Sequence, residues 1–101
     1  MKIEYNDIIY NTEVAKKLGE WHNDAEPDST YYYEETLYVR RGLRNYFIYG
    51  KGGSTSKYAT ETKNGWKAGE AIIPITDFGA EMWAKRKLGK EECLRLFGRV
   101  V

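Results

Sequence analysis

The stretch YYYEETLYVR, from Tyr31 to Arg40, decides the fold of this chain. It is rich in aromatic and β-branched residues, which strands prefer, so it predicts a strand. Residues 41–44 then contain a glycine, which easily adopts the positive φ of a turn, and residues 46–49 return as an apolar run. We therefore predict a long hairpin from Tyr31 to Tyr49.

Further strands are expected on both sides of this hairpin. Residues 3–10 place apolar side chains on either side of Asn6-Asp7, a turn sequence, and predict a small hairpin at the start of the chain. Residues 20–29 predict a brief strand that runs into an acidic loop. Residues 71–75 predict a strand near the edge of the sheet, because Pro74 cannot donate a hydrogen bond to a neighbouring strand.

The segment between the predicted hairpin and the residue 71–75 strand is rich in glycine. Residues 50–56 predict a flexible loop, residues 57–59 a short strand, and Asn64-Gly65 a tight turn.

Helices are expected near both ends. Val14, Ala15 and Leu18 have helical spacing, so we predict a short helix that ends at Gly19. Residues 77–88 carry an apolar stripe after Thr76, a good helix cap, and residues 90–97 predict a second helix.

Separate groups of strands and helices indicate an α+β fold. We predict an antiparallel β-sheet with a short N-terminal helix and two C-terminal helices packed on one face. A chain of 101 residues can build one hydrophobic core, so residues 1–101 are expected to form a single α+β domain.

Composition excludes several protein classes. No stretch approaches the roughly 18 apolar residues that cross a bilayer, and charged residues interrupt the N-terminus before any signal-peptide region builds up. The single cysteine, Cys93, cannot form an intramolecular disulfide, whereas small secreted domains usually need several. We expect a cytoplasmic protein that makes no membrane contact.

The net charge of +1 hides an asymmetry. Residues 1–39 carry three Lys/Arg against nine Asp/Glu, a net −6, and residues 40–101 carry thirteen against six, a net +7. Such a separation attracts charged partners, or the two parts pair with each other in the folded chain.

Motifs for catalysis or cofactors are not evident. A phosphate-binding loop would need Gly-Lys-Ser/Thr, but here Lys51 precedes Gly52-Gly53, so the segment is expected to be a mobile connection or a partner-contacting loop. Cys93 lies on the apolar side of its predicted helix and is expected to be a buried core residue. His22 is distant from it in sequence and does not complete a metal site. We predict no enzyme activity, no cofactor and no metal.

The predicted hairpin offers a surface suited to binding. One face of its first strand carries Leu37, Val39 and other residues that suit a core, namely Tyr31, Tyr33 and Glu35. The opposite face and the turn combine tyrosines with arginines, which suits protein interfaces and single-stranded nucleic acids. The candidate partner-binding residues are Tyr32, Tyr38, Arg40, Arg41, Arg44, Tyr49, Lys51 and Lys57. The alternative is that the tyrosines form a second packing layer.

The chain resembles small proteins encoded by phages and mobile elements of Gram-positive bacteria. The segments that carry the resemblance are Tyr10-Asn11-Thr12, Ala15, Leu18 to Trp21, Glu35 to Val39, Tyr46 to Gly53, Ser56 to Ala59, Gly69-Glu70 and Ile73 to Thr76. Small proteins of this kind often disarm host defence, and anti-CRISPR proteins are the best-known examples. The resemblance implies a binder that occludes a nuclease or its nucleic-acid channel, and it transfers no catalytic residue.

We therefore expect a non-enzymatic inhibitor that binds a host protein or ribonucleoprotein complex, of which a Cas effector is one example. The alternative is a small nucleic-acid-binding regulatory module, although such proteins are usually more basic than this chain. A third hypothesis, an enzyme such as a modifying transferase, would need a cofactor pocket that the sequence does not locate. The oligomeric state stays open, because an exposed tyrosine-rich strand could pair with a copy of itself.

Overall fold

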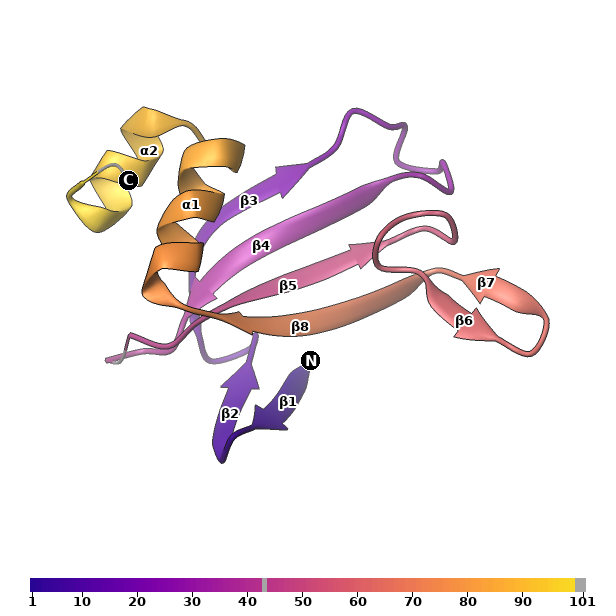
Figure 1. Cartoon of the computed structure of the whole chain (residues 1–101), viewed down its shortest axis with the longest axis horizontal. Helices are drawn as coiled ribbons and strands as arrows, with labels where there is room; N and C mark the ends of the chain where they lie inside the picture. Colours follow the sequence, from indigo (N-terminus) through magenta and orange to yellow (C-terminus); the bar gives the residue numbers. More distant parts are fainter. Residues whose placement is uncertain (43, 100–101) are drawn as a thin grey trace.

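The structure is a computed structural model that describes residues 1–42 and 44–99. Its core is a four-stranded antiparallel sheet in the order β3-β4-β5-β8, with two small hairpins and two helices around it (Figure 1). The elements are β1 (Lys2–Tyr5), β2 (Ile8–Asn11), β3 (Lys16–His22), β4 (Tyr33–Val39), β5 (Tyr46–Gly52), β6 (Thr60–Thr62), β7 (Gly65–Lys67), β8 (Gly69–Ile75), α1 (Asp77–Lys87) and α2 (Lys90–Phe97).

The predicted long hairpin is confirmed as β4 and β5. The two strands pair without a break from Tyr33 opposite Gly52 to Val39 opposite Tyr46. Beyond Val39 the Arg40 amide donates to the Asn45 carbonyl at 3.0 Å. Gly42 adopts a φ of 73° in the turn, as its position predicted, while Leu43 lies outside the described residues.

The N-terminal hairpin and the edge strand also agree with the sequence. β1 and β2 pair around Asn6 and Asp7, whose φ values of 51° and 64° belong to the left-handed region that tight hairpin turns require. β8 pairs with β5 alone and forms one edge of the sheet, which accommodates Pro74.

The predicted N-terminal helix is wrong, because the chain enters β3 at Lys16. Leu18 packs on the helix side of the sheet, and Ala15 packs on the opposite side. A two-turn helix is marginal by itself, so pairing with β4 and burial on both faces outweigh the local helical spacing.

Gly19 has a packing role in place of the predicted helix stop. A Cβ at Gly19 would lie 2.5 Å from Cδ1 of Leu88, the residue that caps the end of α1. Glycine therefore allows the end of α1 to lie directly on β3, where the strand also has a register irregularity between Lys17 and Gly19.

Both predicted C-terminal helices are present and lie together at one end of the sheet (Figure 1). α1 begins after Thr76, whose Oγ1 accepts a hydrogen bond from the Gly79 amide at 3.0 Å, as an N-cap side chain should. The helix side of the sheet buries Leu37, Tyr46, Ile48 and Ala80 in one cluster.

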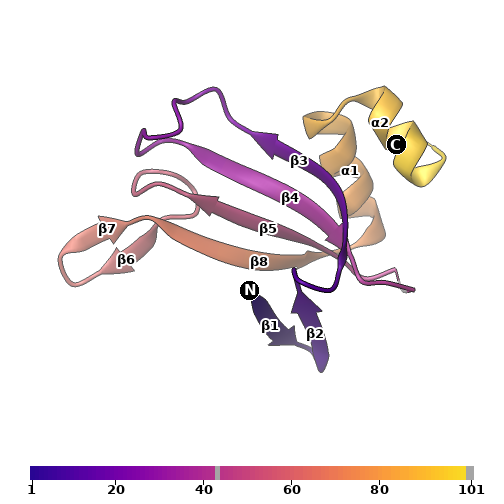
Figure 2. The same ribbon diagram turned by 180° about the vertical axis from the view of Figure 1, so that it is seen from behind.

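The opposite side of the sheet is also covered. Tyr10 of β2 packs with Phe47 and Ile72 in a second cluster, and the β1–β2 hairpin lies away from the helices (Figure 2). Three layers therefore replace the two that we expected, and both sides of the sheet carry packed side chains at this end.

The glycine-rich segment crosses back over the sheet before it forms a small hairpin. Residues 57–59, predicted to be a strand, lie in a turn, and pairing begins only at Thr60 in β6. The tight turn predicted at Asn64-Gly65 is present one residue earlier: Lys63 and Asn64 connect β6 to β7, and Gly65 begins β7 with a φ of 113°. Neither helix of the described chain is long and apolar enough to cross a bilayer.

Candidate functional site

The structure distributes the eight predicted binding residues over several places. Three of them lie at or beside the hairpin turn, where Arg40 donates to Asn45 Oδ1 at 3.1 Å and Arg41 Nε to the Val14 carbonyl at 2.9 Å. Arg44 is exposed there and makes no ion pair within the described residues. Two of the three guanidinium groups therefore already hold the turn in place.

Two predicted tyrosines belong to the second packing cluster. The Tyr38 ring stacks on Phe47 with centroids 5.1 Å apart, and Tyr49 packs beside it and donates to Glu70 at 3.2 Å. Burial and the nearby Glu70 carboxylate raise the pKa of Tyr49. Their rings thus form the second packing layer that the sequence left as an alternative.

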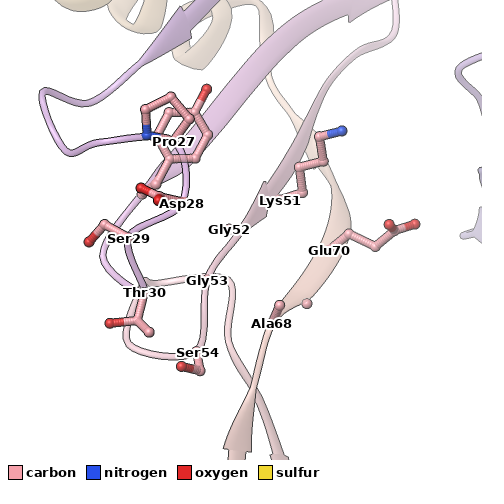
Figure 3. Close-up of a pocket in the computed structure, with 12 residues that line it drawn as sticks. Pro27, Asp28, Ser29, Thr30, Lys51, Gly52, Gly53, Ser54, Ala68 and Glu70 are labelled. Carbon is pink, nitrogen blue, oxygen red and sulfur yellow. The ribbon is translucent and has the colours of Figure 1, made fainter.

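Tyr32 and Lys51 meet at Glu34, beside a hollow of about 570 Å³. The Tyr32 hydroxyl donates to Glu34 at 2.8 Å, a hydrogen bond that raises the pKa of the phenol, and Lys51 Nζ lies 3.4 Å from the same carboxylate. Figure 3 shows the acidic loop around Asp28 on one side of this hollow and Lys51 with Glu70 on the other. Charged side chains of both signs surround the hollow, so it favours neither an anionic nor a cationic ligand.

The glycines beside this hollow are explained by close chain packing. A Cβ at Gly53 would overlap the Thr30 carbonyl group, and one at Gly69 would overlap the carbonyl oxygen of Tyr58. The Gly53 amide also donates to the Tyr32 carbonyl at 2.9 Å. The glycine-rich segment is therefore joined to the chain before β4 and is not the free loop that we expected.

Lys57 lies on the other side of the sheet, next to a buried carboxylate. Glu35 is 3% exposed, and Lys57 Nζ lies 3.1 Å from its Oε2 atom. Two further donors complete the group: the Tyr58 hydroxyl at 2.5 Å and Trp83 Nε1 at 2.9 Å. We call Glu35, Lys57, Tyr58 and Trp83 the Glu35 cluster.

The position of Tyr58 depends on a glycine. A Cβ at Gly50 would overlap the Tyr58 ring, so only glycine in β5 lets this ring lie against the strand and reach Glu35. The segment from Gly50 to Tyr58 thus forms one structural unit in which the glycine makes room for the tyrosine.

The environment of Glu35 makes it an anchor rather than a proton donor. Burial by itself raises the pKa of a carboxyl group, but the hydrogen bonds from Tyr58, Trp83 and Lys57 outweigh this effect and lower the pKa of Glu35 below 4.5. Burial and the bond to Glu35 raise the pKa of Tyr58. Glu35 is therefore ionised and Tyr58 neutral near pH 7.

The Glu35 cluster borders a groove of about 510 Å³ between α1 and the sheet, the helix-side groove. Its floor consists of isoleucines of β5 and β8, and its walls come from α1, β3 and the loop before β6. The residues that line it are Trp21, Glu35, Ile48, Lys57, Tyr58, Ile73, Ile75, Gly79, Met82, Trp83, Arg86 and Lys87.

The rim of the groove is cationic. Lys57 stands at the loop side, and Arg86 and Lys87 belong to the last turn of α1, where cations also interact favourably with the helix dipole. Lys87 Nζ lies 3.7 Å from the centroid of the Trp21 ring, a cation–π contact that ties α1 to β3. The groove therefore has an apolar floor and a positive rim.

Sequence reasoning singled out Lys57 but missed the three other members of the cluster. A usable signal existed, because Glu35 alternates with Leu37 and Val39 on the strand face that we assigned to the core. A carboxylate on a core face requires partners. Which residues supply them depends on long-range contacts that strand patterning does not reveal.

The two residues considered for catalysis lie apart. Cys93 is fully buried between α1 and α2, as predicted for a core residue, and its Sγ contacts the Glu81 carbonyl at 3.5 Å. His22 is exposed at the end of β3, and its Nδ1 lies 2.8 Å from the Asn23 carbonyl. Among residues 1–42 and 44–99, no three histidine, cysteine or acidic side chains gather as a metal site would require.

Comparison of the chain with protein-family models, with curated proteins and with solved structures gave no match.

Proposed function

We propose that this is a non-enzymatic binding protein that acts on a protein or ribonucleoprotein complex of a bacterial host through the helix-side groove. The observation that carries the proposal is the position of Glu35 beneath the groove. One buried carboxylate holds Trp83 of α1 on one wall and Tyr58 with Lys57 on the other. The two walls are therefore fixed relative to each other before a partner binds.

A groove of this kind suits macromolecular recognition. A surface that is already ordered loses less conformational entropy on association, which raises affinity. Tryptophan, tyrosine and arginine contribute disproportionately to interface energy, and the groove contains Trp83, Tyr58 and Arg86. The exposed arginine at the rim also favours fast encounter with a negatively charged partner.

The specific form of the proposal is an inhibitor of host defence, such as an anti-CRISPR protein in the host cytoplasm. It rests on the resemblance of segments such as residues 35–39 and 46–53 to small phage and mobile-element proteins. Both segments build the groove: the first contains Glu35 and the second contains Ile48. Such an inhibitor needs no chemistry of its own, because occupying a functional surface of the partner is sufficient.

Affinity purification with matched variants tests the proposal. We expect the wild-type protein to retain a stoichiometric partner from the cytoplasm of a Gram-positive host, and Arg86→Glu to lose it. Arg44→Glu, at the hairpin turn, is the matched charge reversal and should retain the partner. If Arg44→Glu lost the partner and Arg86→Glu retained it, the interface would lie at the hairpin turn and not at the groove.

The inhibitor form has a separate test. Target-DNA cleavage by purified Cas effectors with guide RNA is measured with and without the protein, and inhibition is expected for the wild type but not for Arg86→Glu. Unimpaired cleavage together with no co-purified partner would remove the proposal.

The cationic rim supports a second candidate, a nucleic-acid-binding regulatory module. Lys57, Arg86 and Lys87 would contact phosphates, and binding to DNA or RNA alone would fall steeply with salt. A mobility-shift titration at low salt that shows no complex would exclude this candidate.

A further inference from the structure

The floor of the helix-side groove presents apolar surface to solvent. Ile73 of β8 is 42% exposed although it lies on the helix side of the sheet, opposite Ile48. Met82 of α1 faces the same space, and Phe78, one turn earlier, is 62% exposed. Covering this surface with an apolar side chain would stabilise a complex by about 25 cal/mol for each Å² removed from water.

The aromatic rings of the groove are poorly placed to stack on nucleic-acid bases. Trp21 has the Lys87 ammonium over one face and contacts Tyr33 at 5.5 Å between centroids. Trp83 uses its indole N–H on Glu35, and Tyr58 is only 6% exposed. Base stacking needs an open ring face, so the groove suits aliphatic side chains better than bases.

The charges of the groove select for a negative ligand. Glu35 is the only acidic residue among the described residues that line the groove. It is buried, and its carboxylate already interacts with Tyr58, Trp83 and Lys57. Arg86 is exposed and has no ion-pair partner within residues 1–42 and 44–99. Lys57 keeps about half of its side chain exposed while it contacts Glu35. Carboxylates of a ligand would find cations at both sides of the apolar floor.

On this basis we infer that the helix-side groove binds an acidic segment of a partner protein that inserts one large apolar side chain between β8 and α1. Carboxylates on either side of that anchor pair with Lys57 and with Arg86. The inference rests on the proposed binding function and names the chemistry of its partner.

The three tryptophans allow a direct test by NMR. Trp21 and Trp83 line the groove, whereas Trp66 is exposed on the β6–β7 hairpin and lies outside it. The probe is a short ¹⁵N-unlabelled peptide with a central leucine flanked by aspartates and glutamates. During titration into ¹⁵N-labelled protein, the indole N–H signals of Trp83 and Trp21 should shift and that of Trp66 should not.

Two control ligands separate the alternatives. A peptide with lysines in place of the acidic residues should leave all three signals unchanged, and so should a short oligothymidylate. Shifts of Trp83 with the oligothymidylate but not with the acidic peptide would replace the inference with nucleic-acid binding. Equal affinity for both peptides, or no shift with either, would overturn it.

Matched variants locate the site. Arg86→Glu and Ile73→Glu should each weaken binding of the acidic peptide at least about tenfold, a change typical of a lost interface hot spot. Lys90→Glu and Ile9→Glu, also at exposed positions, should not change it. If Ile73→Glu unfolds, Arg86→Glu decides the question, and unchanged affinity for it overturns the inference. If the purification recovers a host partner in an Arg86-dependent way while the peptide fails to bind, the binding function stands and an acidic segment is removed as the ligand of the groove.

Discussion

The hydroxyl of Tyr58 donates a hydrogen bond to the carboxylate of Glu35 across 23 positions of sequence. This contact joins the loop that follows the central hairpin to the middle of β4. It also sets the wall of the helix-side groove that Lys57 and Tyr58 form. Its removal should therefore affect stability and groove shape together.

Tyr58→Phe should lower the free energy of unfolding by about 1–3 kcal/mol, because it leaves a buried carboxylate with one donor fewer. Tyr32→Phe is the matched control, since its hydroxyl bonds the more exposed Glu34, and it should change stability by less than about 0.5 kcal/mol. Urea unfolding followed by circular dichroism measures both. Equal effects of the two changes would contradict the role of Glu35 as an anchor.

Stability should fall in acid because of Glu35. Its pKa is lower in the folded chain than its ordinary value of 4.5, so its contribution is present above pH 4.5 and is lost as the pH falls through the lower, folded-state value. Glu35→Gln should flatten the unfolding free energy against pH in that window. The free energy of unfolding is measured by urea unfolding from pH 7 to pH 3 for the wild type and for Glu35→Gln. If it depended on pH in the same way in both proteins, Glu35 would not be the cause of the loss of stability in acid.

Gly50→Ala should be strongly destabilising, by about 2–4 kcal/mol, because the added methyl group would overlap the Tyr58 ring and displace it from Glu35. Gly42→Asn is a useful control, because no atom beyond the neighbouring residues of the chain lies within 4 Å of its Cβ position and asparagine tolerates positive φ.

A double-variant cycle isolates this overlap. In a Tyr58→Ala background, Gly50→Ala should cost far less than in the wild type, since the clashing ring is gone. Additive effects in thermal or urea unfolding would mean that glycine is needed at this position for another reason.

The Cys93 thiol should be unreactive in the native state. It is fully buried between α1 and α2, so a thiol reagent such as Ellman's reagent reaches it only when the C-terminal helices open locally. We expect slow modification in buffer and immediate modification in urea. Fast reaction without denaturant would show that α2 separates readily from α1.

Elements with strong local patterns were predictable from the sequence. The β4–β5 hairpin, the β1–β2 turn at Asn6-Asp7, and the helices after Thr76 carry their propensities and caps in consecutive residues. The segment around Leu18 was not predictable, because its helical spacing competes with pairing to β4 that only the folded sheet provides. Tertiary pairing overrode a weak local preference.

The site was less accessible to sequence reasoning than the fold. Lys57 was predicted to bind a partner together with the tyrosines of the hairpin, but the structure places it on the opposite side of the sheet from Tyr38 and Tyr49. The glycines between positions 50 and 53 suggested a mobile loop, whereas each of them makes room for a neighbouring chain segment or side chain. Such close approaches involve residues far apart in sequence, so composition alone does not distinguish them from flexibility.

Glu34 and Glu35 are neighbours in β4, yet each binds one tyrosine and one lysine, on opposite sides of the sheet. A slip of β4 by one residue that carries Glu34 to the position of Glu35 would also carry Tyr33 to the position of Glu34 and the polar Thr36 to the position of Leu37 in the core. The partners of Glu35 would still meet a carboxylate, whereas Lys51 on the other side of the sheet would face Tyr33 instead. The buried carboxylate therefore does not distinguish this slip from the correct alignment, and the aliphatic residues of the strand must select the alignment on which the cluster beneath the groove depends.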